Sequence, residues 1–195
     1  MIRAVAWSCE EHQGIYVPGR SSGSKSETAA FDRPIKNLER FTDEARHAFR
    51  AAAAAGKNSA AAEIGLLAAG TDGVVAAEEK YFRDYVVNGR TLGRGNLFIY
   101  TLGTSVPGEI SIALSLTGPC LFIRDLARPV EGLVRQAEQM VSDGEANEMR
   151  AIWSEPRAAV CLAMVGGEPT ASLPAGWETD PLALCNLLRT MVKPT

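Results

Sequence analysis

The sequence predicts an α/β domain in which helices cover both faces of a β-sheet. Residues 64–69 (IGLLAA) form a continuous apolar run of strand length, which is typical of a strand that is buried on both faces. Residues 130–141 carry apolar side chains at the first, fourth, fifth, eighth, eleventh and twelfth positions, the spacing of an amphipathic helix. Segments of these two kinds alternate along the chain, and such alternation indicates helices packed on a sheet.

Composition limits the class of protein. The 195 residues fit one domain, 46% of them are hydrophobic, and the formal net charge is −3. This acidic balance argues against a protein that follows nucleic-acid phosphates. No apolar run approaches the roughly 20 residues of a membrane span, and residues 1–5 (MIRAV) contain no apolar leader. We therefore expect one cytoplasmic globular domain over residues 1–195, without a membrane span.

The first half of the chain supplies two strands and two helices. Residues 2–7 alternate enough for a strand, and a loop follows it. Thr42 is the candidate N-cap of a helix that continues through the alanine tract and ends at Gly56. After the strand at 64–69, a second helix is expected from about Val74 to residue 88. The side chains expected on its apolar face are Tyr81, Phe82, Tyr85 and Val86.

The second half continues the alternation. Residues 109–116 predict a short apolar helix or turn, and Pro129 suits the first turn of the long amphipathic helix. A terminal amphipathic helix is expected at about 181–192. The five strands that the sequence predicts are 2–7, 64–69, 120–123, 149–153 and 158–165.

Cysteine and histidine are too scattered for a metal site. The cysteines contain no CxxC pair, and we interpret them as small buried apolar side chains. Histidine occurs only at positions 12 and 47, and His47, on the alanine-rich helix, is expected at the surface. The glycines at 89, 93 and 95 do not form a dinucleotide-binding motif. The sequence therefore predicts no metal and no cofactor. The four cysteines are Cys9, Cys120, Cys161 and Cys185.

Three stretches together resemble the N-terminal half of the β-ketoacyl synthases, the condensing enzymes of fatty-acid and polyketide synthesis. Residues 64–73 (IGLLAAGTDG) look like the family's strand and glycine-threonine turn. Residues 103–119 (GTSVPGEISIALSLTGP) are similar to its glycine-rich segment that ends in Gly-Pro. The following strand leads into the long helix, as in the family. Residues 145–147 (EAN) also resemble the family's acidic turn, so the resemblance covers most of a core at about 60–165.

The resemblance implies a thiolase-like half-fold, with a five-stranded mixed sheet and helices on both faces. It also implies a catalytic cysteine at the start of the long helix, where the helix dipole favours the thiolate. Counting from the Gly-Pro, Ala127 occupies that position. Cys120 lies seven extended residues earlier, roughly 23 Å away, and is not expected to replace it. The family's catalytic histidines have no counterpart, because no histidine follows His47.

We therefore interpret the chain as a non-catalytic, ketosynthase-like protein similar to the chain-length-factor subunits, acting in fatty-acid, polyketide or polyene biosynthesis. Its expected partner is a ketosynthase, an acyl carrier protein or a second copy of itself. The family dimerises through the strand after the Gly-Pro, so this strand is the expected partner-binding site, with alternate side chains on opposite faces. The residues concerned are Cys120, Leu121, Phe122, Ile123, Arg124 and Asp125.

Other functions remain open at this point. One alternative is an enzyme of unrelated chemistry on a reused half-fold, and another is a structural or regulatory binding module. Arg124, Asp125 and Arg128 fit either a charged plug at a disused pocket or a surface turn. Acids that adjoin on the expected helices, at 43–44 and 78–79, are interpreted as solvated. The polar residues that such an enzyme could use are Asp72, Ser105, Glu109 and Asp125.

Overall fold

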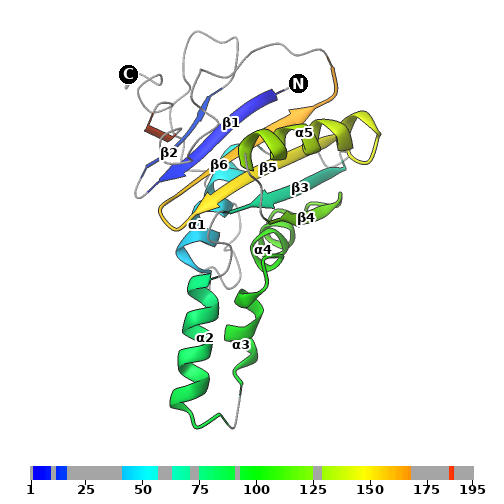
Figure 1. Ribbon diagram of the computed structural model, residues 1–195. Helices are drawn as coiled ribbons and strands as arrows, with labels where there is room; N and C mark the ends of the chain where they lie inside the picture. Colours follow the sequence, from blue (N-terminus) through cyan, green and yellow to red (C-terminus); the bar gives the residue numbers. More distant parts are fainter. Residues whose placement is uncertain are drawn as a thin grey trace.

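The fold is described from a computed structural model, which is shown in Figure 1. Its elements form a sheet with helices on either side, and two helices project from one end. The residues described are 2–9, 12–16, 41–56, 63–70, 75–90, 93–124, 129–167 and 185–186.

The sheet has six strands in the order β2-β1-β6-β5-β3-β4. β3 pairs in parallel with β4 and β5, whereas β5, β6, β1 and β2 pair antiparallel to one another in succession. The predicted class, a mixed sheet covered on both faces, is confirmed. The strands are β1 (Ile2–Cys9), β2 (His12–Tyr16), β3 (Ile64–Ala69), β4 (Cys120–Ile123), β5 (Glu148–Glu155) and β6 (Ala158–Val165).

All five predicted strands are present, and β2 extends the sheet by one more. The sequence analysis placed a loop after the first strand, but residues 12–16 return along β1 as a hairpin. The pairing begins at Cys9 opposite His12 and reaches Val5 opposite Tyr16. β2 therefore occupies the edge opposite to β4.

The helices observed at 43–54 and 129–142 agree with the sequence signals that predicted them, whereas the helix predicted at 109–116 begins earlier, at Ser105, and ends at Leu114. Thr42 caps α1, because its hydroxyl oxygen accepts a hydrogen bond from the Ala45 amide at 3.1 Å. α1 ends at Ala54, and Gly56 takes the positive φ of 125° that glycine tolerates. The helices are α1 (Asp43–Ala54), α2 (Val75–Val87), α3 (Gly95–Phe98), the 3-10 helix η2 (Ile99–Thr101), α4 (Ser105–Leu114) and α5 (Pro129–Ser142).

Two separate apolar cores lie on the two faces of the sheet. α5 covers one face through the buried side chains of Val130, Leu133, Ala137 and Met140. On the other face α1 packs through small alanines, which let the helix approach the strands closely, and α4 adds Val106 and Ile110.

The predicted terminal helix, 181–192, lies mostly outside the described residues. Cys185 is described, and it is buried in the core on the α5 side with its thiol 3.7 Å from the Ala159 carbonyl oxygen.

Candidate partner-binding site

β4 is the edge strand of the described sheet, and its start is fixed by a close approach of two backbone segments. The Gly118 amide donates to the Ile64 carbonyl oxygen at 2.9 Å, and the Leu66 amide donates to the Pro119 carbonyl oxygen at 2.7 Å. A Cβ atom on Gly118 would lie 2.6 Å from the Gly65 nitrogen. Glycine at 118 is therefore required for β4 to begin beside β3. The opposite edge of β4 carries no described strand.

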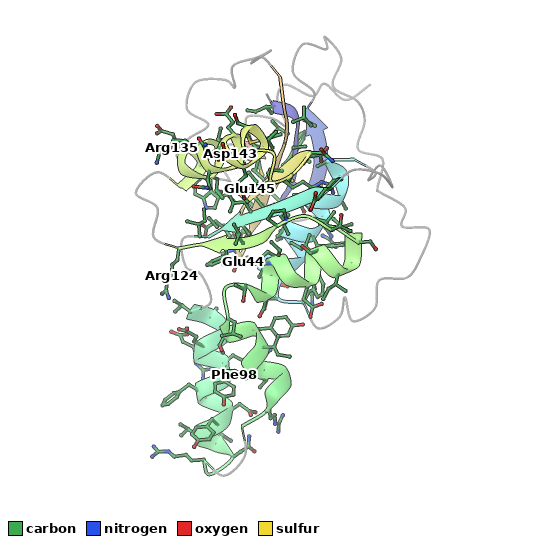
Figure 2. The ribbon with its side chains drawn as sticks, turned by 90° about the vertical axis from the view of Figure 1, so that its right-hand side faces the viewer. Glu44, Phe98, Arg124, Arg135, Asp143 and Glu145 are labelled. Atoms are coloured by element: carbon green, nitrogen blue, oxygen red, sulfur yellow. The ribbon has the colours of Figure 1, made fainter. Side chains whose placement is uncertain are left out.

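The side chains of β4 alternate between the two faces, as expected from strand geometry. Phe122 packs against the core under α1 and α4, whereas Ile123 packs against the core under α5. Leu121 is 45% exposed, and Cys120 and Arg124 are exposed. Figure 2 shows Arg124 at the end of the strand. Asp125, the last residue of the predicted partner site, lies outside the described residues, and the binding role of the strand stays a prediction.

The chain that precedes β4, from Gly103 through α4, packs against one face of this strand. A Cβ atom on Gly103 would lie 2.6 Å from two ring carbons of Phe122, so the aromatic ring lies directly on this glycine. The Ser111 hydroxyl on α4 is 3.4 Å from the Cys120 sulfur. α4 and the chain that enters it are thus attached to β4. The expectation that all four cysteines are buried is wrong for Cys120, because it lies on the open edge.

The position predicted for the missing nucleophile, Ala127, lies outside the described residues together with Arg128. α5 begins at Pro129, as the sequence predicted. Cys120 stands at the beginning of β4, whereas α5 follows the end of that strand. The Cys120 thiol is therefore at the end of β4 that is far from α5, where the helix dipole of α5 does not act on it.

Two buried hydroxyl groups contact α1, and the sequence analysis did not find them. Ser8 Oγ lies 3.0 Å from His47 Nδ1, and Ser154 Oγ donates to Glu44 Oε1 at 2.8 Å. Both serines lie opposite Ala159 of β6, so they form one row across three strands. The expectations of a surface position for His47 and a solvated Glu44 are wrong, because both side chains face this row.

A serine within hydrogen-bond reach of a histidine is also the arrangement of an activated nucleophile. Here Ser8 has no exposed surface and His47 is 9% exposed, because His47 lies on the side of α1 that faces the sheet and α1 covers Ser8. A substrate has no route to this hydroxyl in the described structure. The contact instead fixes the position of α1 on the sheet, together with the contact of Glu44 and Ser154.

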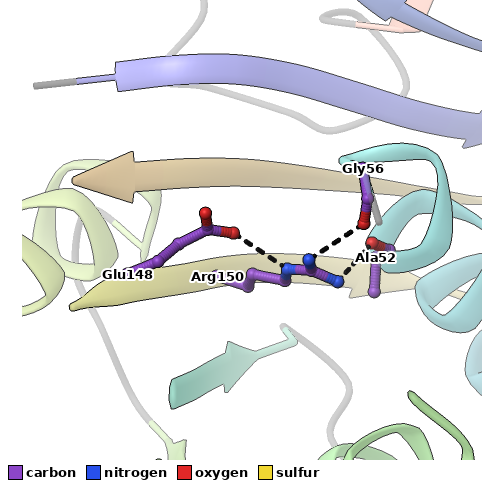
Figure 3. A network of polar contacts seen from close by, with 4 residues as sticks. All are labelled: Ala52, Gly56, Glu148 and Arg150. Atoms are coloured by element: carbon purple, nitrogen blue, oxygen red, sulfur yellow. Dashed lines mark hydrogen bonds and ion pairs between the residues drawn. The ribbon is translucent and has the colours of Figure 1, made fainter. Parts of the chain in front are cut away.

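A buried arginine anchors the far end of α1, as Figure 3 shows. Arg150 of β5 has no exposed surface and donates to Glu148 Oε1 at 3.1 Å. It also donates to the carbonyl oxygens of Ala52 and Gly56, each at 3.0 Å. These carbonyls end α1, where a positive charge is favourable. The arginine is therefore satisfied by structural partners and does not point into a site.

Of the four residues named for an alternative enzyme, the structure describes only Ser105 and Glu109, which both lie on α4. Ser105 donates its hydroxyl proton to the Ile99 carbonyl oxygen at the start of α4, and Glu109 is half-buried on the same helix. Asp72 and Asp125 lie outside the described residues. A half-open pocket of about 320 Å³ lies elsewhere, between the end of α5 and the end of β6. Its lining residues are Glu138, Val141, Ser142, Met164, Val165, Gly166 and Gly167.

Within the described ranges, no three His, Cys, Asp or Glu side chains gather in a way that could hold a metal ion. None of the described helices combines the length and apolarity needed to cross a bilayer.

The comparisons with known proteins bear on this fold. No family model matches the chain, and no curated protein matches its sequence. A solved structure, ketosynthase ApeO in complex with its chain length factor ApeC from Xenorhabdus doucetiae, contains a chain that superposes with a TM-score of 0.56. The match covers 84% of this chain and 76% of that chain at 12% identity. This chain has the fold of a ketosynthase–chain length factor subunit.

A second solved structure is similar over a shorter region. It is the ishigamide ketosynthase/chain length factor, with 14% identity and a TM-score of 0.46 over 55% of this chain. The chain spans only 36% of that longer chain. The likeness to the ApeO–ApeC structure confirms the ketosynthase-like fold that the sequence resemblance implied, and at 12% identity it concerns the fold alone.

Proposed function

We propose that the chain is a non-catalytic, ketosynthase-like subunit that pairs with a ketosynthase in fatty-acid, polyketide or polyene biosynthesis. The observation that carries this proposal is the edge of β4 with which none of the described strands pairs, where Leu121 is exposed to solvent near the start of the strand. An unpaired edge with an exposed apolar side chain is a template for another strand. A β-strand of the partner would extend the sheet across this edge.

The sequence supports a role without catalysis. The position that corresponds to the family's nucleophile carries Ala127, and no histidine follows His47. A methyl group forms no thioester, and the general acid–base groups that assist decarboxylation are missing with it. A subunit of this kind contributes its surface to a complex, and the partner supplies the chemistry.

Changing Leu121 to lysine should abolish capture of the partner. A lysine on an edge strand opposes pairing, because its charge would lose water when a partner's strand and side chains packed beside it. The side chain is solvent-exposed in the chain alone, so the fold should tolerate it. The measurement is affinity capture from the native host with the tagged wild-type chain and with Leu121→Lys, followed by mass spectrometry.

The expected result is one enriched protein whose sequence contains the ketosynthase cysteine together with its histidine–histidine or histidine–asparagine pair. This protein should be lost with Leu121→Lys. Gln136→Lys, which adds the same charge on the exposed side of α5, is the control and should retain capture. Enrichment of an acyl carrier protein alone, self-association alone, or capture that survives Leu121→Lys would contradict the proposal.

Restoring the nucleophile should not restore condensation. Ala127→Cys places a thiol two residues before α5, where the helix dipole stabilises the thiolate. We expect this variant to be alkylated faster than wild type. Neither protein should form carbon–carbon bonds from acyl and malonyl thioesters, because one restored member of a cooperating set recovers little. Alkylation kinetics and a condensation assay are the two measurements, and turnover by the wild-type chain would overturn the non-catalytic assignment.

A further inference from the structure

The exposed apolar surface of the described chain is confined to one continuous stretch. Among the described residues, every large apolar side chain that is exposed lies between residues 75 and 121, and none lies on β1, α1, β3, α5, β5 or β6. A concentration of this kind marks an interaction surface. The residues are Val75, Phe82, Val86, Val87, Phe98, Ile99, Leu102, Ile112 and Leu121.

Most of these residues belong to a helical arm, which consists of α2, α3 and η2. None of the residues of α2 is buried, yet the arm has internal packing. The Tyr81 ring lies 5.6 Å from the Phe98 ring in an edge-on arrangement, and 6.4 Å from the stacked Tyr85 ring. Arg94 Nε lies 3.4 Å from Asp84 Oδ2. The arm thus has a defined form of its own, in which Phe82 and Val87 remain 65% and 78% exposed.

The outer part of the arm is basic, although the chain as a whole is acidic. Residues 80–94 contain four basic side chains and one acidic side chain, a net charge of +3, against −3 for the whole chain. Basic and apolar side chains therefore occur together in this part. A surface of this composition complements a partner surface that is acidic and has apolar side chains. The basic residues are Lys80, Arg83, Arg90 and Arg94.

The arm projects beyond the β4 edge. Figures 1 and 2, seen from directions 90° apart, both show it extending past β4 and away from the rest of the sheet. Its base is attached to β4, since Gly103, two residues after η2, lies against the Phe122 ring. A subunit that paired with the β4 edge would occupy the space alongside the arm. That subunit would then lie beside the exposed side chains of the arm and Ile112 on the α4 side of the sheet, and beside Leu121 on the α5 side.

We propose that the helical arm is a second contact with the same ketosynthase subunit that pairs with β4. Phe82, Val86 and Val87 bind apolar side chains of that subunit, and the basic residues of the arm face an acidic surface beside its paired strand. This inference rests on the proposed function. It adds a contact region, and it specifies the charge of the partner surface.

The test uses the purified ketosynthase that the wild-type chain captures. Dissociation constants are measured for wild type, Val87→Asp and Arg83→Glu, with Arg135→Glu on the exposed side of α5 as the charge-matched control. We expect each arm variant to raise the dissociation constant about tenfold or more, and the control to change it less than about twofold. Added salt should weaken wild-type binding more than binding of Arg83→Glu, because that variant removes an attraction that salt screens.

Hydrogen exchange of the arm amides, with and without the ketosynthase, separates this inference from the proposed function. Protection of β4 and of residues 75–90 in the complex supports the proposed function and the arm contact. Protection of β4 alone, with arm variants that bind like wild type, overturns the arm contact and leaves the proposed function standing. Protection of the arm in the chain alone at high concentration, or only with anionic vesicles, assigns the arm to a second copy or to a membrane and overturns the inference. Failure to capture any ketosynthase overturns both.

Discussion

Replacing Leu133 by aspartate should destabilise the fold by about 3 kcal/mol or more, because truncating a buried leucine alone costs about 2–5 kcal/mol and a buried carboxylate adds to that. Leu133 has no exposed surface and lies in the core that α5 forms with the sheet. The apolar side chains around Leu133 offer no ion-pair or hydrogen-bond partner to the introduced carboxylate. Urea unfolding and thermal denaturation measure the effect, and the melting temperature should fall by about 6 °C or more for a chain of this size.

Gln136→Asp provides the matched control for this prediction. Residue 136 is on the exposed side of the same helix, so the same acid there should change the unfolding free energy by less than about 0.5 kcal/mol. If Leu133→Asp melts within about two degrees of wild type, α5 does not cover the sheet in solution.

Replacing Arg150 by methionine should cost about 3–5 kcal/mol, the range measured when one partner of a buried ion pair is removed. Methionine fills much of the arginine volume but removes the ion pair of Arg150 with Glu148. It also leaves the carbonyl oxygens of Ala52 and Gly56 without donors. Denaturant unfolding gives the stability, and hydrogen exchange of the last turn of α1 reports the loss of the anchor.

A second substitution separates charge from packing at this site. The double variant Arg150→Met with Glu148→Gln should recover part of the lost stability, since the carboxylate that lost its ion pair with Arg150 is also removed. Arg135→Met removes an exposed arginine from α5 and should be near neutral. A double variant no more stable than Arg150→Met alone would show that the arginine acts through its bonds to α1, and not through Glu148.

The parts of the fold that the sequence predicts best are those with a strong periodicity. The apolar spacing of α5 and the continuous apolar run of β3 lead directly to a helix on one face and a strand buried on both. β2 has no such pattern, because only two of its five residues (HQGIY) are strongly apolar. Its strand conformation comes from pairing with β1, which is a tertiary interaction.

The same limit applies to the side chains of α1 and α2. His47 and Glu44 are three residues apart, so they share one side of α1, but the serines they contact come from strands distant in sequence. On α2 the predicted apolar face divides: Tyr81 and Tyr85 pack within the arm, whereas Phe82 remains exposed. Periodicity identifies an apolar face of a helix, but it does not show whether the sheet, a neighbouring helix or a partner protein covers that face.

The central position of β6 has a consequence for synthesis of the chain on the ribosome. β6 joins β1 to β5, so without it the sheet consists of two disconnected parts. Cys9 of β1 pairs with Ala158 of β6, so the N-terminal hairpin can join the rest of the sheet only after about 150 further residues have been synthesised. At translation rates of roughly 5–20 residues per second, that interval is about 8–30 s. A nascent chain released before β6 therefore exposes unpaired edges on both parts and cannot close its sheet.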